Sequence, residues 1–72
     1  PLVEEAVPEL LLALQDNDDW VREDAARALG GLGDPRAIPA LRQALKDPEA
    51  DVRQAAREAL EALQATGEKA KP

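Results

Sequence analysis

The stretch that decides the fold is Val21–Leu45, which reads VREDAARALGGLGDPRAIPALRQAL. Its first half places Ala and Leu at helical spacing and then reaches the corner Gly33-Asp34-Pro35. Gly is common just past the last residue of a helix, and Asp followed by Pro is a common start of the next one. The stretch therefore predicts a helix, a tight corner and a second amphipathic helix.

The same pattern occurs twice in the chain. When the sequence is shifted by 31 residues, Pro8–Gly33 aligns with Pro39–Gln64 without a gap. The identical pairs are Pro8/Pro39, Leu10/Leu41, Ala13/Ala44, Leu14/Leu45, Asp16/Asp47, Val21/Val52, Arg22/Arg53, Ala25/Ala56, Ala28/Ala59, Leu29/Leu60 and Leu32/Leu63. Two unrelated amphipathic helices would share apolar spacing, but they would not also share a Pro, an Asp and an Arg. The sequence therefore predicts a repeat protein.

The runs VREDAARALGGLGDPRAIPAL and KDPEADVRQAAREAL resemble short HEAT-like repeats of the kind found in phycobilisome lyase subunits. The resemblance covers about residues 2–63 and implies antiparallel helix pairs stacked into a solenoid, without implying an activity. We therefore expect an all-α fold, an α-solenoid of two HEAT-like helical hairpins with four helices. A domain over residues 1–64 would hold repeats at about 2–33 and 34–64, and residues 65–72 would form a flexible C-terminal tail. Because the chain begins at Pro1 without Met, we expect a processed product, an excised fragment or a designed repeat protein.

Periodicity and turn signals give the bounds of these helices. The predicted helices are Leu2–Leu14, Asp19–Leu32, Ile38–Lys46 and Glu49–Leu63. Pro8 should kink the first helix or begin it as a 3₁₀ turn, Asp18 should cap the second, and Pro35–Ala37 should form a tight turn. The predicted core stripes are Val21, Ala25, Ala28, Leu29 and Leu32 in the second helix, and Val52, Ala56, Ala59, Leu60 and Leu63 in the fourth.

Size and composition limit the class of protein. A chain of 72 residues without cysteine buries only about 60% of its unfolded surface. Two helix pairs also fall short of the roughly three repeats that such stacks usually need, so marginal stability or self-association is expected. No apolar run approaches the roughly 20 residues of a membrane span. Glu4 and Glu5 stand where a signal peptide would be cationic, so we expect a cytoplasmic protein with no membrane partner.

Residue types that carry chemistry are scarce. The chain has no His, Cys, Ser or Tyr, and Thr66 is its only hydroxyl side chain. Nucleophilic catalysis of the Ser–His or Cys–His kind is therefore excluded. The acidic run 16–19 is similar to the start of a calcium loop, but the sixth and twelfth loop positions hold Val21 and Arg27 instead of Gly and Glu. We expect no enzymatic activity, no cofactor and no metal site.

Two arginines recur at one position of the repeat, and two aspartates recur at another. By the resemblance, such Arg and turn Asp residues form a ladder between neighbouring repeats, so the implied ladder consists of Arg22, Arg53, Asp16 and Asp47. In this chain the resemblance implies that Arg53 meets Asp16 or Asp18. The fork of an Arg side chain suits such a ladder because it makes planar, bidentate contacts with carboxylates. The alternative is that the arginines bind an anion or a partner.

Trp20 is the only aromatic residue, and its counterpart in the second repeat is Asp51. Tryptophan is enriched at binding anchors, so we predict a protein contact; the alternative is a ring that packs over the turn. By the resemblance, the second helix of each repeat lines a concave surface. The predicted surface is Trp20, Glu23, Asp24, Arg27 and Gly31, continued by Asp51, Gln54, Ala55, Glu58 and Ala62.

The two ends of the stack are expected to differ. Leu11 and Leu12 occupy the positions at which the second repeat has Arg42 and Gln43. This difference predicts an apolar N-terminal flank and a symmetric contact between two copies through these leucines. The alternative is that Leu11 fills the edge of the apolar stripe and Leu12 is a lone exposed leucine. The fourth helix has polar residues where the second has small ones, as a capping helix does. These polar residues are Arg57, Glu61 and Gln64.

We therefore predict a non-catalytic protein–protein interaction or scaffold module that self-associates through its N-terminal helix into a homo-oligomer, with a dimer favoured. The alternative is a designed or structural building block whose only partner is itself. Nucleic-acid binding is disfavoured because residues 1–24 hold eight acids and one base, which repel a phosphate backbone. A bilin-lyase fragment is also disfavoured, because such a fragment would lack most of a pocket.

Overall fold

The computed structural model describes the backbone of residues 3–69 and the side chains of residues 6–65. Its elements are α1 (Val3–Ala13), α2 (Asp19–Leu32), the 3₁₀ turn η1 (Pro35–Ala37), α3 (Ile38–Ala44) and α4 (Ala50–Lys69). No strand occurs between residues 3 and 69. The chain is therefore all-α, with four helices packed as two HEAT-like hairpins, α1–α2 and α3–α4, as the repeat predicts.

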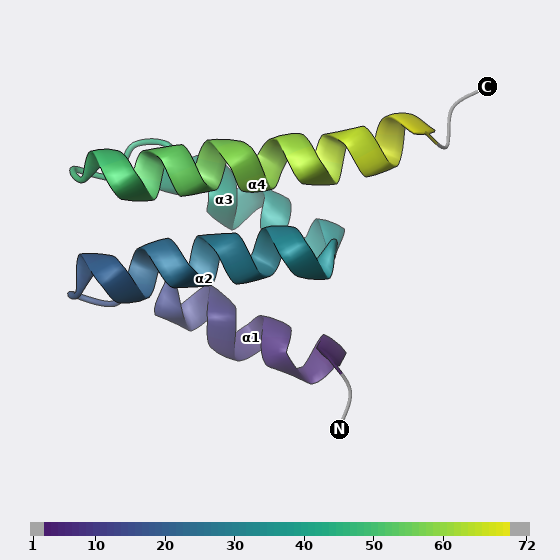
Figure 1. The fold of residues 1–72 in the computed structure, drawn as a ribbon. Coiled ribbons are helices and arrows are strands. Elements are labelled where there is room, and N and C mark those ends of the chain that lie inside the picture. Colours follow the sequence, from purple (N-terminus) through teal and green to yellow (C-terminus); the bar gives the residue numbers. More distant parts are fainter. Residues whose placement is uncertain (1–2, 70–72) are drawn as a thin grey trace.

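The two hairpins stack side by side. Figure 1 shows α2 and α4 as neighbours running in the same direction, with α1 on the side of α2 away from α4 and α3 behind α4. The contact between α2 and α4 is the most extensive in the fold, and it is the contact between the two repeats. This is one step of a solenoid.

The two ends of α2 and the corner that follows it form as their residues predict. The side chain of Asp18 accepts a hydrogen bond from the amide of Trp20 at 2.9 Å and so caps the start of α2. At its other end, Gly33 adopts the left-handed conformation with φ 69°, and its amide donates to the carbonyl of Leu29 at 3.3 Å. Asp34 then accepts the amide of Arg36 at 2.9 Å and starts η1 at Pro35. These caps hold α2 and α3 in their hairpins.

Three predicted boundaries differ from the structure. Helix α1 continues through Pro8 from Val3 to Ala13, and α3 ends at Ala44 instead of Lys46. The amides of residues 45–47 bond to carbonyls three residues back, so the chain tightens into the turn there. Helix α4 runs to Lys69, past residue 65, where the flexible tail is predicted to begin. Ala65, Glu68 and Lys69 favour helix, whereas Gly67 disfavours it; residues 70–72 lie outside the described part.

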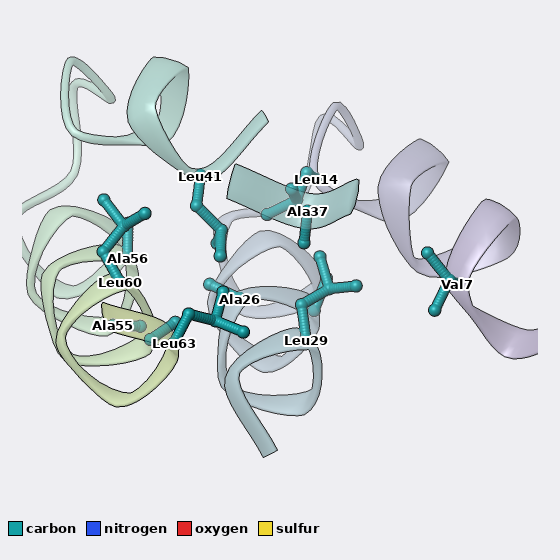
Figure 2. Close-up of a cluster of buried hydrophobic side chains, with 12 residues drawn as sticks. Val7, Leu14, Ala26, Leu29, Ala37, Leu41, Ala55, Ala56, Leu60 and Leu63 are labelled. Carbon is teal, nitrogen blue, oxygen red and sulfur yellow. The ribbon is translucent and has the colours of Figure 1, made fainter. Parts of the chain in front are cut away.

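The core is made of small and branched aliphatic side chains between the two repeats. Figure 2 shows Leu41 reaching from α3 toward α2 and α4, with Ala26 on the one helix and Ala56 on the other. Ala26, Leu29, Leu41 and Ala56 are fully buried. Because alanine side chains are small, the backbones of α2 and α4 can approach closely. The core between these two helices therefore depends on their close approach.

The predicted core stripe is confirmed in α4 and only in part in α2. Val52 is 0% exposed, whereas its counterpart Val21 is 37% exposed. Ala59 is buried, whereas Ala28 is exposed. Helix α2 covers these positions of α4, but no helix among the described residues covers the same positions of α2. Val21 and Ala28 therefore lie at the open end of the stack.

Candidate functional site

The first turns of α2 and α4 line a shallow depression on one face of the molecule. Its volume is about 410 Å³, and its lining residues are Trp20, Glu23, Asp24, Arg27 and Asp51. A second hollow of about 210 Å³ continues between the same helices. It is lined by Arg27, Gly30, Gly31, Ala55, Glu58, Ala59 and Ala62. The structure thus brings together the residues predicted for the concave surface except Gln54, which lines neither hollow, and Ala55 is buried instead of exposed.

Trp20 stands out on this face because the fold does not use its ring. The residue is 74% exposed, although its backbone amide takes part in the cap of α2. The alternative prediction, a ring packed over the turn, is therefore wrong. An exposed indole beside a depression has the shape and chemistry of a binding anchor.

The charges around Trp20 are mostly negative. Arg27 is the one base lining the two hollows, and it forms ion pairs with Glu23 and, at 3.7 Å, with Asp24 on its own helix. Its positive charge is thereby offset locally. Within the described residues, no group of three or more His, Cys, Asp or Glu side chains could hold a metal ion. The residues that line the two hollows therefore carry a net negative charge.

An ionic ladder joins the two repeats, but its direction is opposite to the expected one. Arg22 of the first repeat donates from Nε and Nη2 to the two carboxylate oxygens of Asp47 in the second, at 2.7 and 3.1 Å. Both side chains are largely buried. The Nη1 group of Arg22 donates to the backbone carbonyls of Asp16 and Asn17, at 2.7 and 3.0 Å. This guanidinium therefore joins the turn of its own repeat to the turn of the next one.

The expected pairing of Arg53 with Asp16 or Asp18 is not formed. Arg53 donates from Nη1 to the carbonyl of Asp47 at 2.6 Å, the same local contact that Arg22 makes with Asp16. It has no carboxylate partner among residues 6–65. The carboxylate of Asp16 instead accepts the amide of Asp18 at 2.8 Å. Of the two arginines, only Arg22 thus reaches forward along the chain, to the Asp of the next repeat.

The ladder makes stability depend on pH. Burial raises the pKa of Asp47, but the hydrogen bonds from Arg22 and from the Glu49 amide, with the charges of Arg22 and Arg53, outweigh it and hold this pKa below its ordinary value. A carboxyl group with a lowered folded-state pKa stabilises the fold above its unfolded pKa and loses that effect as pH falls. We expect the melting temperature to fall below about pH 4. Asp47→Asn should melt at a lower temperature than the native chain at pH 7 and at nearly the same temperature at pH 2, as measured by circular dichroism. If the variant and the native chain melted at the same temperature at pH 7 as well, this prediction would be contradicted.

The two leucines predicted for the N-terminal flank lie in different places. Leu12 is 72% exposed. Leu11 is half-buried and lines a groove of about 160 Å³ between α1 and α3, together with Ala40 and Ala44 of α3. The placement of Leu11 at an outer twofold contact is therefore wrong, because its side of α1 faces the second repeat. Leu12 lies on the outer side.

Sequence reasoning missed two exposed apolar residues at the ends of the stack. Val21 was assigned to the core, and Leu45 was not singled out, yet they are 37% and 38% exposed. Leu14, the counterpart of Leu45, is 8% exposed because the second repeat covers it. The signal was available in the repeat alignment: a position that faces the next repeat is uncovered in the last repeat.

Comparison with known proteins identifies the architecture. A family model described as HEAT repeats matches residues 3–67. The chain belongs to the HEAT-repeat family. Its four helices, packed as two hairpins, are thus HEAT repeats.

Curated relatives are much longer than this HEAT-repeat chain. It is 47% identical over 58 residues to "Phycocyanobilin lyase subunit alpha" of Microchaete diplosiphon. The aligned region covers 71% of this chain and 20% of that protein. It is 43% identical over 65 residues to the protein of the same name from Nostoc sp. strain PCC 7120, covering 81% and 24%. It is also 41% identical over 68 residues to "Deoxyhypusine hydroxylase" of Gallus gallus, covering 88% and 23%. The chain therefore spans about a quarter or less of each relative.

None of the chain's helices in the described part combines the length and the apolar character that crossing a bilayer requires.

Proposed function

We propose that this HEAT-repeat chain is a non-catalytic protein-interaction module that associates with itself through its N-terminal flank. HEAT repeats in general mediate protein binding, which supports the coarse part of the proposal. The observation that carries the finer part is Leu12, which is 72% exposed. Its counterpart Gln43 lines the groove facing the first repeat, so the repeat alignment assigns Leu12, like Val21, to the N-terminal flank. Burying two such side chains against a partner is favourable, at about 25 cal/mol per Å² of apolar area.

The residue inventory supports a binding role over a catalytic one. The chain has no His, Cys, Ser or Tyr, which are the usual nucleophiles and general bases. Its hollows are shallow, and the carboxylates that line them are engaged with Arg27 or face solvent. Binding by apolar contact and charge complementarity is the mechanism that these side chains can serve.

The relatives' printed names suggest a second function that we do not propose. Two of them are named phycocyanobilin lyase subunits, but this chain spans only 20% and 24% of their length. Its two hollows, of about 410 and 210 Å³, are open depressions on one face. A small-molecule pocket buries most of its ligand, so these hollows favour a protein surface over a bilin.

The proposal predicts that Leu12→Glu shifts the chain toward monomer. A carboxylate at this position would have to be desolvated in the contact, which disfavours association. Sedimentation at several concentrations measures the shift, and the expected loss of affinity is at least about tenfold. The matched control is Gln43→Glu, the same position in the second repeat, which is exposed in the groove between α1 and α3. Equal behaviour of the two variants would refute a contact at Leu12.

A further inference from the structure

The stack has two outer flanks, which the repeat alignment defines. The N-terminal flank holds residues whose counterparts, 31 positions later, face the first repeat: Glu9, Leu12, Asp16, Val21, Asp24 and Ala28. The C-terminal flank holds residues whose counterparts, 31 positions earlier, face the second repeat: Arg42, Leu45, Lys46, Arg53, Arg57 and Glu61. Figure 1 shows α1 and α4 at opposite sides of the molecule, so the flanks lie at its two ends.

The contact between the chain's own repeats supplies a template for joining these flanks. In it, Arg22 pairs with Asp47, and Gly30 lies against Ala59, where an added Cβ would come within 2.8 Å of that residue. Since α2 and α4 run in the same direction, Ala26 lies opposite Ala55, one turn before that contact. In the α1–α3 groove, Leu11, Leu14 and Gln15 face the side of α3 that carries Ala40 and Gln43.

If the second repeat of one copy contacts the first repeat of another in the same way, the two flanks meet with opposite charges. The pair Arg22–Asp47 is then replaced by Arg53 of one copy and Asp16 of the next, and the pair Ala26–Ala55 is replaced by Arg57 and Asp24. In the groove, Arg42 and Lys46 of one copy take the places of Leu11 and Gln15. Glu9 of the next copy takes the place of Ala40. Of the residues defining the flanks, three on the N-terminal flank are acidic and none is basic, whereas four on the C-terminal flank are basic and one, Glu61, is acidic. Opposite potentials on the two surfaces favour their encounter and fix their register.

The position of the Arg53 side chain and the exposure of Leu45 and Leu12 also fit this contact. Arg53 makes the same hydrogen bond to its own turn, with the carbonyl of Asp47, that Arg22 makes with Asp16. Its guanidinium is thus held in position with no carboxylate partner among residues 6–65. Leu45 of one copy would also cover the region of Leu12 on the next, and these residues are 38% and 72% exposed in the single chain.

One residue opposes the fit. Glu61 stands where the template has Gly30, so its Cβ would meet the backbone of Ala28 as a Cβ at Gly30 would meet Ala59. Both exposed helices can separate slightly to relieve this, at a loss of contact. Glu61 therefore weakens the joint without abolishing the charge match.

We propose that the C-terminal flank of one copy docks on the N-terminal flank of another, in the register of the internal repeats, and that Glu61 limits the strength of this contact. The inference rests on the proposed self-association and changes its symmetry from a twofold to a head-to-tail contact. A head-to-tail contact leaves a free flank at each end, so it builds open stacks that lengthen with concentration instead of closing as dimers.

Cysteine cross-linking tests the symmetry, because the chain has no native cysteine. The variants Asp24→Cys and Arg57→Cys are mixed under mild oxidation, one carrying a mass label. A head-to-tail contact brings the two positions within disulfide range and yields crossed dimers of the two variants. Homodimers of Asp24→Cys alone would overturn the head-to-tail inference while supporting self-association through the N-terminal flank. A native chain that stays monomeric at the highest attainable concentration would overturn both.

The role of Glu61 has its own test. Glu61→Gly removes the obstructing Cβ and should strengthen association at least about tenfold, as measured by light scattering. Glu61→Ala is the matched control, because it removes the same charge but keeps the Cβ, and it should strengthen association less. The contact should also weaken with added salt, because salt screens the attraction between the oppositely charged flanks. Equal association of the Gly and Ala variants would overturn the steric role of Glu61.

Discussion

Gly30→Ala should lower the free energy of unfolding by about 1–3 kcal/mol, even though Ala is the better helix former. A Cβ at this position would lie 2.8 Å from both the Cα and the Cβ of Ala59. The Cα belongs to the backbone of α4, so the clash cannot be relieved by rotating a flexible side chain. Helices α2 and α4 would have to move apart along the most extensive contact of the fold, which loosens the packing of Ala26 and Ala56.

The neighbouring glycine gives a control of the opposite sign. Gly31 is in the same turn of α2, but a Cβ there would meet nothing within 4 Å. Gly31→Ala should therefore gain helix propensity without a clash and stabilise the chain by about 0.8–1.0 kcal/mol. Urea unfolding followed by circular dichroism measures both variants. Stabilisation by both substitutions would mean that α2 and α4 are not in close contact at Gly30.

This pair of glycines shows what repeat periodicity can and cannot predict. The sequence predicts close packing at Gly30, because glycine costs helix propensity and a neighbouring repeat offers a reason for it. It offers no such reason for Gly31, and the structure offers none either. The hairpins, the corner at Asp34 and the buried stripe of α4 also follow from the sequence, because local caps and apolar spacing determine them.

The features that were predicted wrongly depend on what lies beside each repeat. Val21 has the spacing of a core residue, but whether it is buried depends on a preceding repeat that the described chain does not contain. Leu11 looks like surplus apolar surface until α3 is placed beside it. Helix α4 extends to Lys69 although Gly67 disfavours helix, and the repeat alignment gives no information past residue 64. Periodicity determines which residues face a neighbour, but it does not determine whether that neighbour exists.

Among the surface residues, the concave face was easier to predict than the ladder. The positions of Trp20, Glu23, Asp24 and Arg27 follow from one helix and one exposed face, and the structure places them together. The ladder requires the direction in which an Arg side chain crosses to the neighbouring repeat. Both directions satisfy the same sequence spacing, so only the three-dimensional stacking distinguishes Arg22 with Asp47 from Arg53 with Asp16.

Arg22→Ala should lower the melting temperature by about 10 °C, and Arg53→Ala should lower it by only a small part of that. The two residues occupy the same position in the repeat, and each donates to the carbonyl of its own turn. Only Arg22 also makes a bidentate contact with a carboxylate, that of Asp47. Such charge-assisted pairs are stronger than neutral hydrogen bonds, and removing the guanidinium leaves the Asp47 carboxylate, 9% exposed, without its partner.

The melting curves should be recorded by circular dichroism on dilute samples, so that any association through Arg53 does not contribute to its stability. Arg22→Lys separates charge from geometry: an ammonium keeps the positive charge but cannot reproduce the planar fork, so part of the loss should remain. Asp47→Ala combined with Arg22→Ala should cost little more than either change alone, because the two residues act through one contact. Equal losses for Arg22→Ala and Arg53→Ala would contradict a ladder that reaches forward from the first repeat. They would instead indicate that the turn carbonyls, which both arginines share, are the contacts that matter.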